Sequence, residues 1–270
     1  NHTMLKVSII TVVLNNKTFI EDCIRSVIGQ TYANIEYIIV DGGSVDGTCG
    51  IIKKYSSNIG IWISEPDKGI YDAMNKGITL ATGNIIGFVH ADDMLNDKFV
   101  ISNIVNSFIA QNADAIYGDA LIVQRGNINS IYRKWMSGHF KKDSFKYGWA
   151  PPHLSFYVKK DIHNKYGFYR TDLKISADYE FMLRVLYLHD IKVNYLPIFI
   201  PRFRMGGTST KSIYSILKSN YECYLAWKLN GIAMPIYTIP LKLFSKLKQL
   251  TNILKKPSVT IQSNTADKDE

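Results

Sequence analysis

The stretch IEYIIVDGGSVDGT, residues 35–48, runs from apolar, mostly β-branched residues into aspartates, glycines and hydroxyl side chains. Such an apolar run predicts a buried strand, and the polar segment after it predicts a turn that leads into a helix. Residues 7–13, 61–63 and 84–89 are further strand-like segments, and apolar residues at helical spacing lie between them. Strands that alternate with helices predict an α/β fold with a mostly parallel sheet flanked by helices.

Local signals predict where several elements begin and end. Thr18 and Glu21 match a capping box that would start the first helix, and Asp46 is placed to cap the second. Further along the chain the same criteria predict helices over 99–108, 178–188 and 213–229, strands of a mixed sheet edge over 115–123 and 131–135, short strands over 191–195 and 198–203, and a loop over a site at 136–157.

Composition excludes several classes of protein. The chain has 270 residues, of which 46% are apolar and 20% charged, so it can bury a sizeable core and is not wholly disordered. No apolar run is long enough for a spanning helix, and residues 7–14 lack the basic lead of a signal peptide. Three widely spaced cysteines form neither a disulfide framework nor a zinc pattern, which fits a reducing cytoplasm.

Charge is distributed unevenly along the chain. Residues 1–135 hold 11 basic and 13 acidic residues, whereas residues 136–270 hold 21 basic and 10 acidic ones. A basic half indicates an anionic partner, which composition alone leaves open between phosphate, a membrane surface and nucleic acid. Residues 240–256 are amphipathic, with five lysines and no acid. This segment suits an anionic membrane or packing on protein, including a second copy in a homodimer.

Polar clusters follow three of the predicted strands, at Asp41–Thr48, Glu65–Gly69 and His90–Asp93. Ligands of open α/β sheets bind beyond the carboxyl ends of the strands, so these clusters mark a candidate site. Each cluster taken alone is also explained as a turn or a helix cap. The first strand is not followed by a glycine-rich dinucleotide fingerprint, and no P-loop occurs in the sequence. The adjacent carboxylates Asp92 and Asp93 can instead hold Mg²⁺ or Mn²⁺ against a diphosphate.

In order and spacing, these motifs resemble glycosyltransferase family 2, whose members have the A-type nucleotide-sugar-binding (GT-A) fold. The resemblance covers about residues 5–210. It rests on the motifs VSIIT (7–11), IVDGGSVDGT (39–48), EPDKGIYDAMNKG (65–77), ATG (81–83), ADD (91–93) and SADYE (176–180). The most similar members are non-processive bacterial enzymes that build O-antigen of lipopolysaccharide, capsule or colanic-acid-like polysaccharide.

The resemblance implies a domain organisation and an activity. It implies a single catalytic domain over residues 4–210. The residue pattern after this domain predicts basic amphipathic helices over 211–257. We expect residues 258–270 to be a disordered tail and residues 1–3 to be an expression scar. The implied activity is inverting, metal-dependent transfer from a nucleotide sugar, with UDP favoured, to a lipid-linked or saccharide acceptor. A cytoplasmic enzyme, peripheral at the inner face of the cell membrane, would fit this role.

Residue roles follow from the same resemblance. Asp178 matches the general base that deprotonates the acceptor hydroxyl, and Asp93 matches the ligand of Mn²⁺ or Mg²⁺. The residues that match donor-nucleotide contacts are Thr11 at the end of the first strand, Asp41, Asp67, Lys68, Asp92 and Arg204. The residues expected toward the acceptor or a phosphate are His153, Arg202 and Glu180.

Each of these roles has a structural alternative. Asp178 would also serve as a helix N-cap, Asp41 as a turn former, and the two arginines as solvated surface charges. The sequence departs from the family at two positions, with His90 and Ala177 where acids are frequent. His90 either packs in the interior or reaches the metal.

Two other classes of protein compete with the enzyme. A non-catalytic nucleotide-sugar-binding subunit would lack the base or the metal acid, but Asp178 and Asp93 are both present. A nucleic-acid-binding protein would explain the basic half, but it would leave the acidic strand ends unexplained. We therefore do not expect a nucleic acid as partner. A processive synthase is disfavoured because it would need spanning helices.

Overall fold

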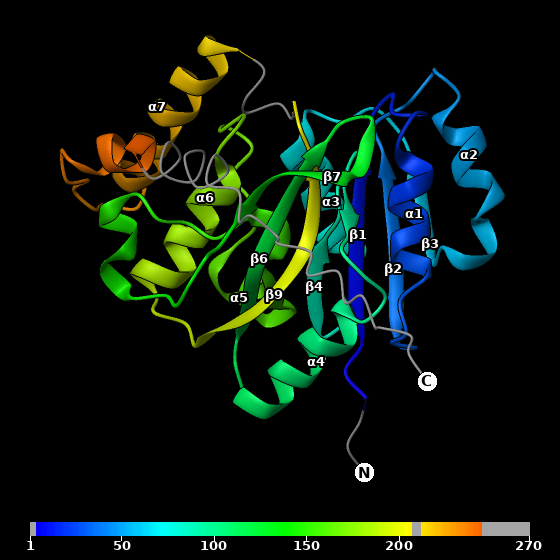
Figure 1. Cartoon of the computed structure of the whole chain (residues 1–270), viewed down its shortest axis with the longest axis horizontal. Helices are drawn as coiled ribbons and strands as arrows, with labels where there is room; N and C mark the ends of the chain where they lie inside the picture. Colours follow the sequence, from blue (N-terminus) through cyan, green and yellow to red (C-terminus); the bar gives the residue numbers. More distant parts are fainter. Residues whose placement is uncertain (1–3, 207–211, 245–270) are drawn as a thin grey trace, which may run out of the picture.

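The computed structural model describes residues 4–206 and 212–244. Its strands are β1 (Val7–Val13), β2 (Ile35–Asp41), β3 (Ile61–Ser64), β4 (Ile85–Phe88), β5 (Met94–Leu95), β6 (Ala115–Gln124), β7 (Asn127–Trp135), β8 (Tyr157–Lys159) and β9 (Val193–Arg204). Its α-helices are α1 (Ile20–Ile28), α2 (Thr48–Lys54), α3 (Ile70–Leu80), α4 (Val100–Gln111), α5 (Lys160–Tyr166), α6 (Ala177–Met182) and α7 (Ile213–Leu229). The strands lie side by side across the middle of the molecule, with α2 at one end and α7 at the other (Figure 1).

One sheet organises the molecule, with the strand order β3-β2-β1-β4-β8-β6-β9-β5 and β7 paired to β6. The strands β1 to β4 are mutually parallel, and β9 is parallel to β6, whereas β8, β5 and β7 pair antiparallel to their neighbours. The predicted α/β fold with a mostly parallel sheet is confirmed. The order reverses between β1 and β4, so the crevice for a ligand is expected beyond the carboxyl ends of these two strands.

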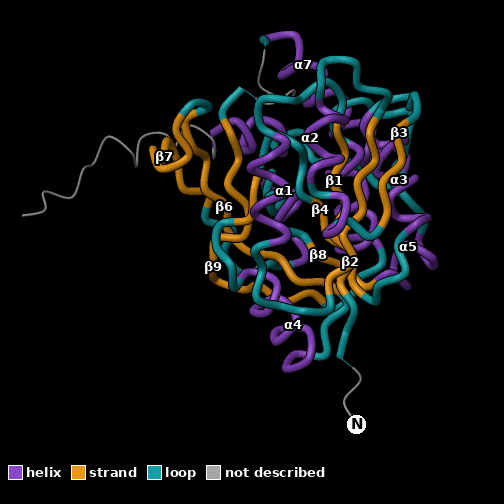
Figure 2. Tube along the Cα trace, turned by 90° about the vertical axis from the view of Figure 1, so that its right-hand side faces the viewer, coloured by secondary structure: helices purple, strands orange, loops and turns teal. Residues whose placement is uncertain are grey.

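Helices cover both faces of the sheet because the central strands are apolar on both sides. Ile10 and Val12 of β1 belong to one core, which they share with α3 and α6. Ile9 and Val13 belong to the opposite core, which they share with α1 and α4. Because helices cover both faces of the sheet, both sides of β1 are buried, and its sequence is a continuous apolar run instead of an alternating pattern. A view turned by 90° shows the β6–β7 hairpin at one side of the molecule (Figure 2).

Several local predictions were wrong in detail. The capping box is not formed, since the N-cap of α1 is Phe19 and no side chain caps it. Glu21 instead bonds Arg25 and Tyr55. The two short strands predicted over 191–203 are one strand, β9, which passes Pro197 through a register shift against β6. The helix predicted over 178–188 is split into α6 and a π-helical turn, Leu183–Leu188.

The C-terminal part is described only up to residue 244. Helix α7 has the predicted bounds, and its Cys223, Ala226 and Trp227 belong to the same core as the central strands. A second helical segment covers residues 238–244. The predicted scar at 1–3, the remainder of the basic segment to 257 and the tail at 258–270 lie outside the described residues. Among the described helices, none is long and apolar enough to cross a membrane.

Candidate active site

The acid pair lies directly after β4, at the point where the strand order reverses. Asp93 is buried, and its Oδ1 accepts a hydrogen bond of 2.9 Å from the backbone N–H of Arg204 at the end of β9. Burial raises the pKa of Asp93 well above its usual value, and the neighbouring charge of Asp92 adds to that rise. Asp93 is therefore a buried carboxyl group whose ionised form the protein stabilises only in part.

Arg204 supplies the main compensation. Its guanidinium lies 2.5 Å from Oδ2 of Asp22, donates to the backbone carbonyl of Asp92 at 2.7 Å, and covers the ring of Phe19. The side chain is buried. Arg204 was predicted as a donor contact. The structure places it beside the acid pair but commits its guanidinium to Asp22, so it acts first as a structural counter-charge.

The predicted base and the predicted acceptor residue meet beside this pair. Oδ2 of Asp178 lies 3.5 Å from Nδ1 of His153, and Oδ1 lies 3.0 Å from the hydroxyl of Tyr71. Burial lowers the pKa of His153, with Asp178 and Asp92 opposing the shift, so the imidazole is mainly neutral near pH 7. The carboxylate of Asp178 is thereby oriented from two sides while its side chain stays 21% exposed.

The N-cap alternative for Asp178 is wrong. The N-cap of α6 is Ser176, and no side-chain hydrogen bond caps this helix. Asp178 lies in the first turn of α6, and its carboxylate is directed to Tyr71 and His153. The side chain is therefore available for chemistry.

His90 packs against this group. Its ring lies 5.3 Å from that of His153, measured between centroids, and its Nδ1 is buried without a hydrogen-bond partner. Burial, with a smaller contribution from His153, lowers the pKa of His90 to about 3. The packing interpretation of His90 agrees with this environment.

Asp41 organises the turn after β2. Its Oδ2 accepts from the backbone N–H groups of Gly43 and Ser44 at 3.1 and 2.9 Å and from the Ser64 hydroxyl at 2.6 Å. Burial alone would raise the pKa of Asp41, but these hydrogen bonds hold it below its usual value. Asp67 lies against the same turn, since a Cβ at Gly42 would overlap its carboxylate. The two loops thus form one surface, although every observed bond of Asp41 also fits a turn former.

Three other candidates have surroundings that give them a structural role. Thr11 lies inside β1 instead of closing it, and its hydroxyl contacts Tyr37 in the interior. Glu180 forms a buried ion pair with Arg184, and Arg202 bonds Asn96 and a backbone carbonyl. The structure does not bring these three side chains to Asp178. Lys68, by contrast, is exposed in the loop that leads to α3.

The donor set fits a divalent cation only if a ligand supplies further oxygens. Within residues 4–206 and 212–244 there is no cluster of three or more His, Cys, Asp or Glu side chains that could hold a metal ion. Mg²⁺ is commonly bound by one or two carboxylates together with substrate phosphates. The buried Asp93 and the half-buried Asp92 beside it fit that arrangement.

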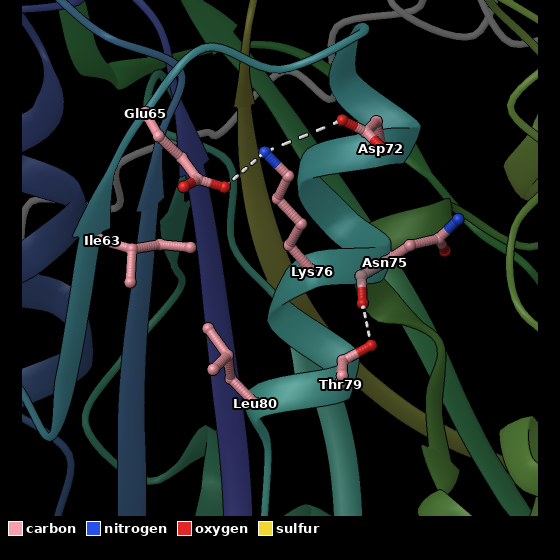
Figure 3. Close-up of a pocket in the computed structure, with 7 residues that line it drawn as sticks. All are labelled: Ile63, Glu65, Asp72, Asn75, Lys76, Thr79 and Leu80. Carbon is pink, nitrogen blue, oxygen red and sulfur yellow. Dashed lines mark hydrogen bonds and ion pairs between the residues drawn. The ribbon is translucent and has the colours of Figure 1, made fainter.

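A groove of about 380 Å³ lies elsewhere, between β3 and α3 (Figure 3). Lys76 points across it to Glu65, at 2.7 Å, and to Asp72, at 3.9 Å. None of the predicted site residues lines this groove. Its only charged groups pair with one another, so it offers no group free for chemistry.

Tyr71 is the site residue that the sequence analysis missed. It lies inside the EPDKGIYDAMNKG motif, so the signal was present, but the motif alone gave this tyrosine no role. The ring is buried, and only the hydroxyl reaches Asp178. Asp22 was missed because it pairs with Arg204 across 182 positions of sequence, a contact that no local pattern shows.

Comparison with known proteins identifies relatives of the chain. The family model described as glycosyl transferase family 2 matches residues 8–170. A PGL/p-HBAD biosynthesis glycosyltransferase of Mycobacterium bovis is 29% identical over 208 residues, which cover 75% of this chain and 78% of the relative. An uncharacterized glycosyltransferase of Mycobacterium tuberculosis is 32% identical over 186 residues, which cover 66% of this chain and 68% of the relative.

Solved structures share the fold at low sequence identity. Staphylococcus aureus TarS 1–349 in complex with UDP-GlcNAc superposes with a TM-score of 0.64 at 17% identity, over 84% of this chain and 65% of that one. The mannosyltransferase PcManGT of Pyrobaculum calidifontis, in complex with GDP-Man and Mn²⁺, gives 0.64 at 15% identity, over 94% and 74%. The chain spans less than half, 43%, of the longer TarS structure.

Fold and site together define a GT-A glycosyltransferase. The chain belongs to glycosyl transferase family 2 and is a nucleotide-sugar-dependent glycosyltransferase. The finer resemblance to O-antigen, capsule or colanic-acid enzymes has no support in these relatives, since the named ones are PGL/p-HBAD glycosyltransferases.

Proposed function

We propose that the protein transfers a sugar, with inversion, from a nucleoside-diphosphate sugar to a hydroxyl of a lipid-linked or saccharide acceptor in the synthesis of a bacterial surface glycoconjugate. The observation that carries this proposal is the convergence of Asp178, His153 and the Asp92–Asp93 pair beyond the carboxyl end of β4. The proposed base and the proposed metal-binding acids, both of which are needed for displacement at the anomeric carbon, would thus act at one site. The UDP-GlcNAc complex of TarS supports a UDP-sugar, and the GDP-Man complex of PcManGT leaves GDP as the alternative.

Asp178 performs the proton transfer. Its carboxylate accepts the proton of the acceptor hydroxyl as the acceptor oxygen bonds the anomeric carbon, and the bond from that carbon to the diphosphate breaks with its electron pair on the leaving oxygen. Tyr71 and His153 keep the carboxylate in place from either side. His153, neutral and 31% exposed, would also contact the acceptor or a phosphate.

Asp93 and Asp92 would hold Mn²⁺ or Mg²⁺, with the diphosphate completing the coordination. When bound, the cation neutralises the charge that develops on the leaving diphosphate. The backbone N–H of Arg204 orients Asp93. Asp41, Asp67 and the exposed Lys68 would contact the nucleotide from the neighbouring loops.

The outer face of α7 suits a membrane-bound acceptor. Tyr214, Leu217, Tyr221 and Tyr224 recur at helical spacing and are 72, 64, 58 and 44% exposed. Glu222, the only acid of α7, is buried, and residues 223–266 contain six lysines and no acid. Exposed aromatic and aliphatic side chains among lysines are typical of helices that lie on anionic lipid surfaces. We therefore include peripheral attachment to an anionic membrane in the proposal.

Vesicle sedimentation tests this attachment. The full chain should sediment with phosphatidylglycerol vesicles and not with phosphatidylcholine vesicles, and the pair Leu217→Ser with Tyr221→Ser should weaken sedimentation. The matched control is Ile131→Ser with Tyr132→Ser, which removes exposed apolar side chains from β7 instead. Equal sedimentation of both double variants would contradict the membrane role of α7. A dimer that only the α7 variant loses would assign this face to a second copy.

A thermal-shift panel tests the transferase proposal. Ligands that bind only the folded state raise its melting temperature, so UDP, GDP, dTDP and CMP are each added with and without Mn²⁺. A shift for one diphosphate that requires Mn²⁺ is expected. No shift with any nucleotide would contradict the proposal. Binding without turnover of the matching nucleotide sugar would instead favour a non-catalytic subunit.

A further inference from the structure

Glu222 of α7 occupies a position that the proposed mechanism does not use. The side chain is 4% exposed. Its partners are three consecutive backbone N–H groups. Oε2 accepts from Lys174, Ile175 and Ser176 at 3.1, 2.7 and 2.9 Å, and Oε1 accepts from Lys174 at 3.0 Å. A buried carboxylate that receives several amide bonds fixes the path of the backbone that donates them.

The backbone that Glu222 holds leads directly to the base. Ser176 is the N-cap of α6, and Asp178 lies two residues further on. The carbonyl of Ile175, in the same turn, accepts a hydrogen bond of 2.7 Å from the Tyr71 hydroxyl, which also contacts Asp178. Ser219, one turn before Glu222 on α7, reaches the Ser176 hydroxyl at 3.1 Å. One carboxylate on α7 therefore fixes both the start of α6 and the acceptor that orients Tyr71.

We propose that Glu222 is a positioning residue, which sets the place of the Asp178 carboxylate by holding the 174–176 turn. The inference rests on the proposed role of Asp178 as base. It gives α7 a part in the reaction although the hydrogen bonds of Glu222 go to the 174–176 backbone and not to Asp178. A displacement of about 1 Å at a reacting group can cost about a hundredfold in rate, so a partial loss of these bonds is expected to be visible in kcat.

Glu222→Gln is the appropriate variant because its size is unchanged and its carbonyl oxygen can still accept amide bonds. The matched control is Glu36→Gln, which neutralises another largely buried carboxylate with several hydrogen bonds at the opposite edge of the sheet. Both variants are expected to lose stability. A structural role for Glu222 therefore predicts the same behaviour in both, whereas a positioning role predicts a difference at Asp178.

The first readout needs no substrate. The ring resonances of His153 report the place of Asp178, since the two side chains are 3.5 Å apart. Glu222→Gln should shift these resonances in the direction that Asp178→Asn shifts them, and Glu36→Gln should leave them unchanged. Unchanged His153 resonances in Glu222→Gln would overturn the proposal whether or not the protein transfers sugar.

The second readout uses the donor that the thermal-shift panel identifies. With kcat calculated per molecule of protein that binds the nucleotide, Glu222→Gln should lower kcat about tenfold or more. The KM for the donor should stay within about twofold of the value for the unchanged protein. Glu36→Gln should retain the kcat of the unchanged protein. An equal kcat in both variants would overturn the positioning role, and absence of turnover in the unchanged protein would overturn the proposed function alone.

Discussion

Two largely buried carboxylates at opposite ends of the sheet differ in how their charge is compensated. Glu36, at the start of β2, accepts from Lys6 at 2.8 Å, from Ser8 at 2.6 Å and from the backbone N–H of Thr82 at 2.7 Å. Burial alone would raise its pKa, but these bonds lower the pKa to about 2. At Asp93, burial and the neighbouring Asp92 carboxylate raise the pKa well above the usual range, although the Arg204 backbone bond and the charges of Arg204 and Arg125 oppose this shift.

The difference separates a carboxylate that stabilises the fold from one that is kept for a ligand. At Glu36 one lysine and several hydrogen-bond donors of the protein occupy the carboxylate, so the fold itself uses this charge. At Asp93 the compensation is incomplete, which is a cost that folding alone does not explain. Substitutions at Asp93, beyond the carboxyl ends of the strands, should therefore reduce function without reducing stability. Substitutions at Glu36, at the amino end of β2, should reduce stability without reducing function.

The largest expected effect is on turnover by Asp178→Asn. The substitution keeps the size and the contact with Tyr71 but removes the proton acceptor, so transfer should fall about a thousandfold. Nucleotide binding should be unchanged. Turnover of the identified donor is the measurement. The matched control is Asp172→Asn, an exposed carboxylate paired with Arg170 shortly before α6. Comparable turnover of the two variants would remove Asp178 from the role of base.

Glu36→Gln should lower stability and leave function intact. The variant loses charge-assisted hydrogen bonds to Lys6, Ser8 and Thr82, so the free energy of unfolding should fall by about 2 kcal/mol. Urea denaturation measures this change. A loss of metal-dependent nucleotide binding in this variant would show that the two edges are not independent.

His163 in α5 is a buried imidazole that, unlike Glu36, has no hydrogen-bond partner at its side chain. Both ring nitrogens are buried without hydrogen bonds, the ring stacks on Phe181, and burial lowers the pKa to about 3. The unfolded state, with a pKa near 6.5, binds a proton first as the pH falls. Stability is therefore full above pH 6.5 and is lost between pH 6.5 and about 3, by about 2 kcal/mol at pH 5.

His163→Phe keeps the stacked ring and removes the titrating group. Denaturation at pH 7.5 and pH 5 should show a smaller loss of stability in this variant than in the unchanged protein. His90, which has a similarly lowered pKa, remains in both proteins and cancels in the comparison. Equal acid losses in the two proteins would contradict the assignment to His163.

The smallest expected effect is a gain in stability from Asp93→Asn. The asparagine oxygen can still accept from the Arg204 backbone, and the cost of burying the Asp93 carboxylate beside Asp92 is removed. The free energy of unfolding of the ligand-free protein should rise by about 1 kcal/mol. Thermal denaturation without metal measures it. A loss of stability as large as that of Glu36→Gln would show that Asp93 is as well compensated as Glu36.

Local sequence patterns predicted the sheet and the acids at its strand ends, because both can be recognised from short runs of neighbouring residues. They located β1 to β4 and the acids after them, and the structure brings Asp92, Asp93, His153 and Asp178 into one group. They could not show which polar residues are already satisfied. Glu180 and Arg202 carry the right chemistry, but Arg184 and Asn96 occupy them through contacts that only the folded chain creates.

Contacts between residues far apart in the sequence also explain why local patterns missed the start of α1 and the partners of Asp178. Thr18 has the residue type and spacing of a cap, yet α1 begins after Phe19 because the preceding turn is held by other bonds. Tyr71 and Glu222 are, respectively, 107 and 44 positions from Asp178 in sequence, and the fold alone relates them to it.

The central claim is that the acid pair after β4 holds the donor diphosphate through a divalent cation. The direct measurement is calorimetric titration of the identified nucleoside diphosphate into the unchanged protein, Asp93→Asn and Glu36→Gln, each with and without Mn²⁺. We expect Mn²⁺ to strengthen binding at least about tenfold, or about 1.4 kcal/mol, in the unchanged protein and in Glu36→Gln, and to have no effect in Asp93→Asn. The same Mn²⁺ dependence in Asp93→Asn would contradict the claim.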